Sequence, residues 1–560
     1  MKNIPIGEVL KEKGYITQQQ LEKALDYHKQ HRDIRLGQVL TQLGFVTERQ
    51  ILSAMCDKLN LRMLPLETYP INIEAVKKIP RVLAEKYSAI AVSEADNRLT
   101  IVVHDPLNFY GIEDIRQVTG MQLDVTVAEE SAIEHAIDVC YSEIEAKQAA
   151  ATMATEEEQT LSAVSAEAMR ELEEGNDTPV IRLLNSLLLH GYNIGASDIH
   201  IEPMETQTRV RLRIDGMLLP YMTLNSALHQ PLIARTKILS NLDIAEKRSP
   251  QDGHFIARVE GVEMNLRVSV VPTIYGEKIV LRYLNSAAAI QNAKQFGMNP
   301  TNYEKFMRML QNPNGIIYLT GPTGSGKTTT LYFALEELVK RQVNITTIED
   351  PVERHIRGVN QIQVNPLAGI SFESGLRALL RQDPDILMVG ETRDNQTAEI
   401  SVRSAITGHL VLSTLHTNDA LSSIIRLQDM GIEPYLLANA VVGLVAQRLV
   451  RKICPYCREE YTPTPHIQQL LGGEVSVLSR GKGCPACNHT GYKGRIAVHE
   501  IVEIDRTMRQ MITTKTSIEQ MDAYVREKQA FVSLTQEAKN LVLSGITTAE
   551  EMLKLMYSAQ

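Results

Sequence analysis

The feature that most constrains the fold of this chain is a glycine-rich segment, GPTGSGKT, at residues 321–328. It follows a short apolar run at residues 316–320 and precedes a stretch with helical character. In a loop of this kind, between a strand and a helix, the backbone N–H groups of the loop and of the helix N-terminus point toward one position and bind phosphates there. The segment therefore predicts a P-loop and, with it, an α/β sheet that binds a nucleoside triphosphate.

Each residue type in the loop has a chemical reason to be there. Lys327 can neutralise the β- and γ-phosphate oxygens, and the Thr328 hydroxyl can bind Mg²⁺. The residues expected to contact the nucleotide are Gly321, Pro322, Thr323, Gly324, Ser325, Gly326, Lys327, Thr328 and Thr329.

A P-loop needs carboxylates for the metal ion and for the attacking water, and two strand ends offer them. Glu349 follows the apolar residues 345–348, and Glu391 follows residues 386–390. Side chains at the carboxyl ends of neighbouring parallel strands converge on a bound ligand. His416 ends another strand, where a γ-phosphate sensor belongs, and His409 precedes the same strand. Alternatively, each acidic cluster is a solvated turn and each histidine a packed or surface residue.

Strand-like runs at 316–320, 345–348, 386–389 and 410–414 alternate with helical stretches. Continuous apolar strands separated by helices predict a parallel sheet covered on both faces. We therefore expect an ATPase domain at 291–560, and its last 75 residues should be helical.

The preceding region, 178–290, predicts a smaller α/β domain. Thr178 and Pro179 should open a helix, and Asp215-Gly216 should form a hairpin turn after a strand at 208–214. Alternation along that strand places Arg209, Arg211 and Arg213 on one face and the apolar side chains between them on the other. Further strands are expected near 254–259, 262–271 and 278–284.

The first 60 residues repeat at an offset of 30, so that IGEVLKEKGYITQQQ at residue 6 aligns with LGQVLTQLGFVTERQ at residue 36. Gly14 and Gly44 can end one helix in each unit, and Thr17 and Thr47 can begin the next with a capping box. The pattern predicts a helical module at 1–60, a small α/β part at 61–145 and an Ala/Glu/Thr-rich linker at 146–177.

Four of the six cysteines form two CxxC pairs, which are separated by 26 residues. Two such pairs offer four thiolates to a tetrahedral, structural Zn²⁺. The predicted ligands, in an insert at 450–490, are Cys454, Cys457, Cys484 and Cys487. A redox role for the pairs is the alternative.

Composition excludes some classes of protein. The net charge is −9, Trp is absent and aromatic residues make up 5%, which disfavours a nucleic-acid-binding protein. No apolar run reaches the roughly 18 residues of a membrane span, and the N-terminus lacks the apolar stretch of a signal peptide. A cytoplasmic protein is therefore expected.

The ordered motifs resemble the Walker A, Asp, Walker B and His boxes of the secretion ATPase superfamily, in its GspE/PilB group. They are the P-loop, TIEDPVE at 347–353, ILMVGETRD at 386–394 and GHLVLSTLHTND at 408–419. Four further segments between 196 and 282 match the domain that precedes the motor in that group. They are ASDIHIEP, RLRIDG, RSPQDG and RVSVVPTIYGEKIVLR. The resemblance implies a RecA-like P-loop ATPase core with this α/β domain, the N-terminal helical module and the tetracysteine insert.

The resemblance also implies a homo-hexameric ring, ATP with Mg²⁺, and roles for individual residues. Glu349 would polarise the attacking water, and Glu391 would help hold Mg²⁺. Arg213, Arg267 and Arg282 would reach toward the phosphates; each could instead be a surface ion-pair partner. Such motors act at the inner face of the cell membrane on a platform protein, and through it on pilin-like subunits of type IV pili or type II secretion pseudopili. No nucleic-acid partner is expected.

The N-terminal repeat resembles a cyclic-di-GMP-binding domain found on some of these motors. That pattern begins Arg-Leu-Gly and ends with Gln 23 residues after the Arg. The second unit has Arg35 but Lys58 at the last position, and the first has Pro5 and His28. Two interpretations stay open: binding of cyclic-di-GMP, or docking of a helical module on a membrane-protein tail.

Three classes of function compete. A motor that hydrolyses ATP uses Lys327, Thr328, Glu349 and Glu391 together. A nucleic-acid translocase on the same type of sheet would need a basic, aromatic surface that the composition does not favour. A scaffold that binds ATP without turnover would not need the carboxylates.

Overall fold

The computed structural model describes residues 5–31, 34–157, 178–284, 297–473 and 475–558. The chain divides into two units, Met1–Tyr283 and Leu284–Gln560, each described here by itself. The finer domain boundaries expected from the sequence stay predictions. Most of the predicted linker, residues 158–177, lies outside the described residues, and helix α8 continues through the part before it.

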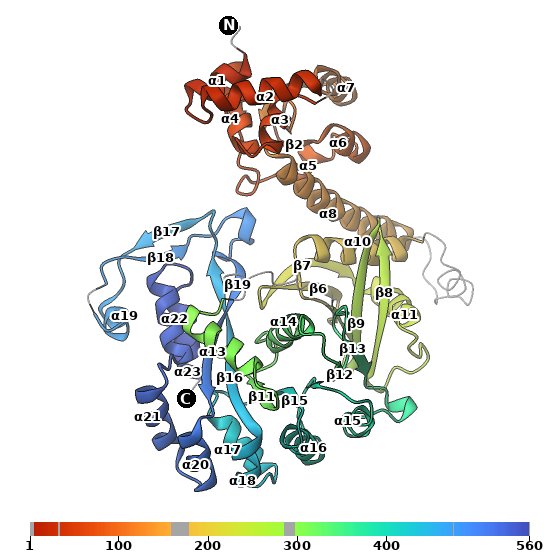
Figure 1. Ribbon diagram of the computed structural model, residues 1–560. Coiled ribbons are helices and arrows are strands. Elements are labelled where there is room, and N and C mark those ends of the chain that lie inside the picture. The colour runs from red at the N-terminus through yellow and green to blue at the C-terminus, as the bar shows by residue number, and fades with distance from the viewer. Residues whose placement is uncertain (1–4, 32–33, 158–177, 285–296, 474, 559–560) are drawn as a thin grey trace. The chain divides into compact units, whose positions relative to one another are not determined.

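The N-terminal helical module consists of two similar helix pairs (Figure 1), α1 (Ile6–Glu12), α2 (Gln18–Gln30), α3 (Leu36–Gln42) and α4 (Glu48–Leu59). Both predicted capping boxes form, because Thr17 and Thr47 accept a hydrogen bond from the backbone of Gln20 and Gln50, whose side chains bond back. Gly14 and Gly44 have φ of +72° and +69°, as the left-handed end of the preceding helix requires. The repeat is therefore confirmed as two helix pairs.

A four-stranded sheet with order β1-β4-β3-β2 follows the module. Its elements are β1 (Arg62–Met63), α5 (Ile73–Val76), α6 (Arg81–Tyr87), β2 (Ala89–Ala95), β3 (Arg98–Val103), α7 (Phe109–Thr119), β4 (Gln122–Val127) and α8 (Glu130–Glu157). Apolar side chains of β2 and β3 are fully buried beneath helix α8 residues such as Ile133 and Ile137. The strand predicted at 99–103 and the helices at 112–119 and 130–141 are confirmed.

The second sheet of this unit is antiparallel, with order β7-β6-β5-β10-β9-β8. Its elements are α10 (Pro179–Asn193), β5 (Asp198–Pro203), β6 (Gln207–Ile214), β7 (Met217–Asn225), α11 (His229–Leu239), β8 (Gln251–Val259), β9 (Val262–Thr273) and β10 (Gly276–Tyr283). The hairpin turn is confirmed, with Asp215 and Gly216 both at positive φ. Along β6, Val210 and Leu212 are buried while Arg209, Arg211 and Arg213 are half-buried, as alternation requires.

One detail at the start of α10 differs from the prediction. Thr178 stands at the N-cap position with Pro179 following, but its side chain makes no capping hydrogen bond. Pro179 therefore begins the helix through its restricted φ, without help from the Thr178 hydroxyl.

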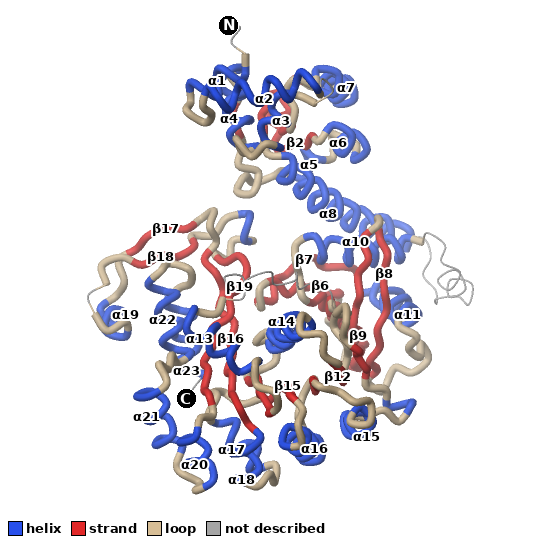
Figure 2. The backbone as a smooth tube through the Cα atoms, viewed as in Figure 1, coloured by secondary structure: helices blue, strands red, loops and turns tan. Residues whose placement is uncertain are grey.

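The C-terminal unit is built on a seven-stranded sheet with order β13-β12-β14-β15-β11-β16-β19, and helices cover it (Figure 2). Its first part comprises α13 (Pro300–Leu310), β11 (Gly315–Thr320), α14 (Lys327–Val339), β12 (Ile345–Glu349), β13 (Asn360–Gln363), α15 (Phe372–Leu379), β14 (Ile386–Val389), α16 (Asn395–Ile406) and β15 (Leu410–Leu415). These strands are parallel, and β11, β12, β14 and β15 are entirely buried. The four strands predicted for this region are confirmed.

The rest of this unit differs from the all-helical end that we predicted. It comprises α17 (Ser422–Asp429), α18 (Pro434–Ala440), β16 (Val441–Ile453), β17 (Arg458–Tyr461), α19 (Pro465–Leu470), β18 (Leu478–Gly481), β19 (Tyr492–Glu503), α20 (Arg506–Thr513), α21 (Ile518–Lys528), α22 (Leu534–Leu543) and α23 (Ala549–Ser558). Strand β19 lies within the last 75 residues and pairs antiparallel with β16. Residues 497–502 of β19 are buried, and their backbone groups pair with β16. No local pattern reveals this long-range pairing.

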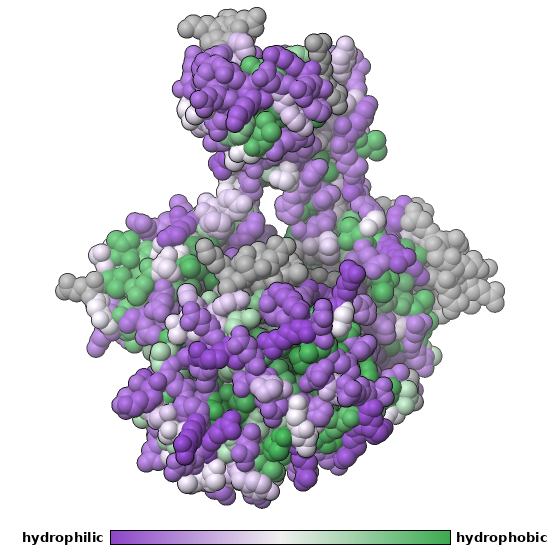
Figure 3. Space-filling model, viewed as in Figure 1, coloured by the Kyte–Doolittle hydropathy of each residue, from purple (hydrophilic) through white to green (hydrophobic). Residues whose placement is uncertain are grey.

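Among the residues that the structure describes, no helix combines the length and apolarity of a bilayer-crossing segment. Hydrophilic side chains predominate on the face of the molecule drawn in Figure 3. Exposed apolar side chains do occur, including Tyr110 and Ile274, which are 88% and 94% exposed.

Candidate nucleotide site and metal centre

The P-loop lies between the carboxyl end of β11 and the amino end of α14. Gly321, Gly324 and Gly326 all have positive φ, which favours glycine. A Cβ atom on Gly321 would lie 2.4 Å from the carbonyl oxygen of Gln447, so the loop packs directly on strand β16. Thr323 and Gly324 at its tip are exposed, while Ser325 beneath them is buried. Thr328 and Thr329 are half-buried in the first turn of α14.

Lys327 is the buried cation of this loop. Its Nζ donates to the carbonyl oxygens of Gly321 at 2.6 Å and Pro322 at 3.1 Å. Burial and the charge of Arg448 together lower the pKa of Lys327 to about 8, against the opposing charge of Glu391. A cation that is partly desolvated at a helix N-terminus suits a multiply charged anion such as a triphosphate. These residues fit the phosphates of ATP.

Glu391 and His416 lie at the ends of the two strands that follow β11 across the sheet. The order β14-β15-β11 brings the segments after these strands to one edge, and Glu391 acts electrostatically on Lys327. The Glu391 carboxylate contacts Arg393 Nε at 2.5 Å, and its other oxygen lies 3.6 Å from His416 Nε2. The structure therefore brings Lys327, Glu391 and His416 together at one edge.

Glu349 lies at the end of β12, on the far side of β14 from the P-loop strand. Its side chain is buried and accepts hydrogen bonds from the Tyr332 hydroxyl, from Thr347 Oγ1 at 2.6 Å and from Gln361 Nε2 at 3.0 Å. Both carboxylate oxygens thus have partners within the chain. The role of Glu349 with the attacking water stays a prediction.

The two histidines of the same strand lie at opposite ends of it. His409 precedes β15, and its Nδ1 lies 3.0 Å from the Ser404 carbonyl oxygen, so it packs against the end of α16. His416 follows β15, and the backbone N–H of the next residue, Thr417, donates to Oγ1 of Thr320 at the end of β11 at 2.7 Å. Only His416 lies at the P-loop edge of the sheet.

Sequence reasoning missed two polar residues behind the P-loop, Gln447 and Arg448. The Gln447 amide donates to the Ser325 carbonyl at 2.9 Å and accepts from Thr330 Oγ1 at 2.6 Å, which ties the loop to β16. Arg448 is 7% exposed. A polar pair in the middle of the apolar strand 441–450 is the signal that could have revealed them.

The four cysteines of the two CxxC pairs form one cluster. Their sulfur atoms all lie within 4.8 Å of one another. The distances are 3.8 Å for Cys454–Cys484, 3.9 Å for Cys457–Cys487 and 3.7 Å for Cys484–Cys487. Zn–S bonds of about 2.3 Å in a tetrahedron place the sulfur atoms about 3.8 Å apart. The cluster therefore fits a structural Zn²⁺.

With this geometry established, comparisons with known proteins decide the family. The family model described as "Type II/IV secretion system protein" matches residues 173–554. The type II secretion system ATPase E of Vibrio cholerae serotype O1 is 37% identical over 494 residues, which are 87% of this chain and 98% of that protein. This chain belongs to the type II/IV secretion system protein family. It is an ATPase of that family, and the resemblance inferred from the four boxes is confirmed.

A second relative agrees with this assignment, and a solved structure shows the same fold. The type IV pilus assembly ATPase PilB of Myxococcus xanthus is 35% identical over 559 residues, which cover 98% of each chain. The X-ray structure of the ATPase DotB of Legionella pneumophila has a TM-score of 0.51 at 21% identity and covers 67% of this chain and 95% of its own. The expected fold class is confirmed.

This secretion ATPase also carries the three arginines predicted to reach the phosphates. Asp198 holds two of them, Arg282 at 2.7 Å and Arg213 at 3.5 Å. Arg267 is exposed and stands opposite Arg282 in the sheet. Their contact with nucleotide stays a prediction.

The N-terminal region of this secretion ATPase contains a cavity of about 970 Å³ between the second helix pair and the small α/β part. Arg35 and Lys58 line it from the repeat, together with Asp105 and Glu130 from the α/β part. Arg35 Nη1 is bound to Asp105 at 2.6 Å. A family model named "MshEN domain" matches residues 59–147.

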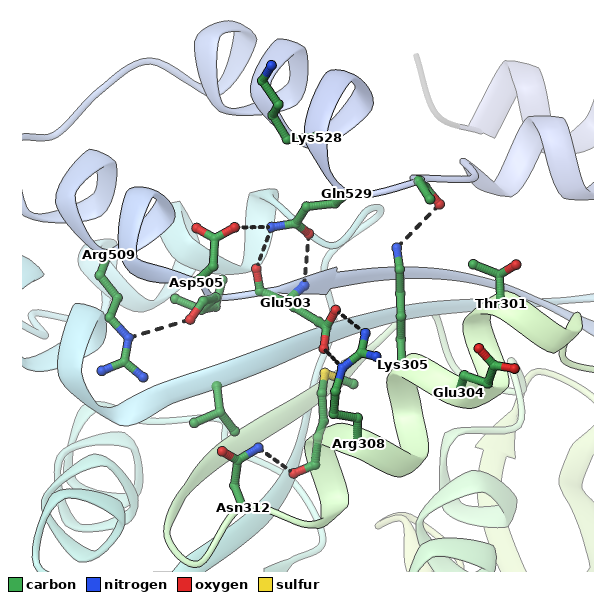
Figure 4. A pocket seen from close by; sticks show the side chains of 14 residues that line it. Thr301, Glu304, Lys305, Arg308, Asn312, Glu503, Asp505, Arg509, Lys528 and Gln529 are labelled. Carbon is green, nitrogen blue, oxygen red and sulfur yellow. Dashed lines mark hydrogen bonds and ion pairs between the residues drawn. The ribbon is translucent and has the colours of Figure 1, made fainter.

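The C-terminal unit also contains a charged cavity of about 580 Å³, whose lining side chains are drawn in Figure 4. Val442 is part of the cavity wall. Its neighbour Val441 pairs with Ile316 at the start of β11, whereas the P-loop follows the other end of β11. The cavity therefore lies away from the P-loop. Arg308 binds Glu503 at 2.7 Å, Gln529 binds Asp505 at 3.1 Å, and Lys305 Nζ lies 3.4 Å from the Ala530 carbonyl oxygen. Because these charged groups find partners within the chain, we assign the cavity no ligand.

Proposed function

We propose that this ATPase is a cytoplasmic motor that powers the assembly of type IV pili or of type II secretion pseudopili. The observation that carries the proposal is the joint placement of Lys327, Glu391 and His416 at one sheet edge in a chain of this family. The full-length similarity to both an ATPase E and a PilB supports each machine equally.

In the proposed reaction the P-loop backbone and Lys327 bind the triphosphate, and Thr328 and Glu391 hold Mg²⁺. Bound Mg²⁺ neutralises the charge of the β- and γ-phosphate oxygens. Glu349 orients the attacking water, and His416 contacts the γ-phosphate before and after cleavage. Arg213, Arg267 and Arg282 complete the phosphate contacts. The remaining loop residues, from Pro322 to Gly326 and Thr329, shape the cradle.

We further propose that the working form is a homo-hexamer peripherally bound to the inner face of the membrane. A platform protein in that membrane is its direct partner, and pilin-like subunits are moved through the platform. The zinc cluster and the N-terminal region are the parts that face this partner.

The test replaces Lys327 by Ala in the source cell. Surface pili are counted by electron microscopy, and exported proteins are assayed in the same culture. Loss of pili with normal export identifies a pilus motor, whereas loss of export with normal pili identifies a secretion motor. Unchanged pili and export, with ATP turnover retained by the purified variant, would overturn the proposal.

A second proposal concerns the N-terminal cavity, which we suggest binds cyclic-di-GMP. The supporting observation is Arg35 in a large cavity beside the region that matches the MshEN model. Pro5, His28 and Lys58 depart from the expected pattern, so one repeat rather than two would contribute the guanidinium.

Calorimetric titration of the full chain with cyclic-di-GMP tests this second proposal. Arg35→Ala should abolish binding. Arg62→Ala, which removes an exposed arginine bound to Asp124 outside the cavity, should not. Absence of binding to the parent chain, or equal binding by both variants, would leave docking on a membrane-protein tail as the explanation.

A further inference from the structure

Arg448 is a buried cation that forms no ion pair among the described residues. It lies in the middle of β16 and is 7% exposed. Its hydrogen bonds within the described residues go to uncharged oxygens: Asn418 O at 2.9 Å, Asn418 Oδ1 at 3.2 Å and Gln447 O at 3.3 Å. Burial lowers the pKa of Arg448, although Asp419 and Glu500 act in the opposite direction from farther away. A guanidinium held in this way costs folding free energy, so its position calls for a function.

Arg448 holds the loop that follows His416 through Nη2, which donates to both the carbonyl and the side-chain oxygen of Asn418. Asn418 is two residues beyond His416, and the residue between them, Thr417, is bonded to Thr320 at the end of β11. A second contact supports the same loop from strand β19, where Glu500 Oε1 accepts from the Ala420 backbone at 3.1 Å. In the β16–β19 pair, Ala446 lies opposite Glu500, so the two side chains share one face of the sheet. Arg448 is two residues beyond Ala446 on the same strand, and side chains two apart point to the same face. Arg448 and Glu500 therefore point to the same face.

Arg448 also lies directly behind the P-loop. A Cβ atom on Gly321 would be 3.1 Å from Arg448 Nη1, and the Arg448 charge acts on Lys327. The same side chain thus contacts the first residue of the P-loop and the loop after the sheet-edge histidine, two segments more than 90 residues apart in sequence.

We propose that Arg448 is a positioning residue for ATP hydrolysis, which holds the His416 loop through Asn418 and adds a buried positive charge behind the P-loop. The inference rests on the proposed roles of Lys327 and His416. The hold and the charge are separable, because lysine keeps the charge but lacks the planar guanidinium that reaches Asn418 through Nη2 and Gln447 through Nη1.

The test compares Arg448→Lys and Arg448→Met with the parent full chain, using kcat and KM for ATP measured at one pH. A buried positive charge behind the P-loop attracts the triphosphate, so Arg448→Met should raise KM severalfold while Arg448→Lys keeps the parental KM. Both variants should lower kcat by about tenfold, because the His416 loop is released.

The matched control is Arg451→Met, which removes an arginine from the same strand whose partner is Glu551 at 2.8 Å. It should leave KM and kcat as in the parent, and thermal unfolding verifies that each variant is folded. A parental KM in folded Arg448→Met overturns the charge role. A parental kcat in Arg448→Lys overturns the holding role, and it does so even if the methionine variant fails to fold. Failure of the proposed roles themselves is seen separately, as ATP turnover that survives Lys327→Ala.

Discussion

At the scale of single residues, two carboxylates that end neighbouring strands differ in what they contact. Glu391 faces Arg393 and His416 and acts on the P-loop lysine. Glu349 is enclosed by hydrogen-bond donors from Tyr332, Thr347 and Gln361. The same residue type at equivalent strand ends therefore enters different environments, because helix α14 and strand β13 enclose only one of them.

Replacing Glu391 by Gln should remove catalysis while ATP still binds. A positioned carboxylate in a proton-transfer or metal-binding role contributes about 10²–10⁴-fold to rate, so we expect kcat to fall by at least about 100-fold. Steady-state ATPase assays and nucleotide-binding titrations measure the two effects. Glu373→Gln, which removes a surface carboxylate paired with Arg377, is the control that should keep normal turnover. Normal turnover in Glu391→Gln would contradict the assignment.

At the scale of elements, the long antiparallel pair β16–β19 organises the end of the C-terminal unit. The two strands pair from Gly443–Glu503 to Ile453–Tyr492, and the cysteine cluster closes the connection between them. Helix α23 returns to this pair, where Glu551 binds Arg451 at 2.8 Å and Lys554 at 2.7 Å. The cluster thus holds both ends of a connection whose short strands β17 and β18 have little core of their own.

Loss of one zinc ligand should therefore destabilise this unit. We expect the parent chain to contain one zinc per chain and Cys484→Ser to contain none, with a fall in Tm, because structural zinc binding contributes directly to folding free energy. Elemental analysis and thermal unfolding measure both. The control is Cys140→Ala, a buried cysteine outside the cluster, which should keep its zinc. Full zinc content in Cys484→Ser would contradict the four-thiolate site.

At the scale of the whole molecule, the stability of the C-terminal unit couples to pH through a buried carboxyl group. Glu500 lies in β19 and accepts backbone hydrogen bonds from Ala420 at 3.1 Å and Leu534 at 3.3 Å. It thereby joins the loop after His416 to the start of α22. Burial raises the pKa of Glu500 to about 7, well above the ordinary value for a glutamate side chain.

Because the folded pKa of Glu500 is raised, the folded state holds a proton that the unfolded chain releases between pH 4.5 and 7. Unfolding free energy should therefore fall as pH rises through this window, by up to about 3 kcal/mol. Glu500→Gln should remove this loss, so that its Tm relative to the parent is higher at pH 8 than at pH 5. Val498→Ala, a substitution without a titratable group on the same strand, should shift Tm equally at both pH values. An equal shift at both pH values for Glu500→Gln would contradict the linkage.

The sequence by itself determined the features that depend on short-range rules. The P-loop and its flanking elements, the Asp215-Gly216 hairpin turn, the capping boxes at Thr17 and Thr47 and the pairing of two CxxC segments could be read directly, because each depends on a few adjacent residues. Only the tertiary structure decided that Glu391 and His416 meet, that Glu349 is enclosed, that residues 492–503 form a strand and that Arg448 lies behind Gly321. These depend on strand order and on contacts between segments far apart in the chain, for which neither periodicity nor spacing provides a local signal.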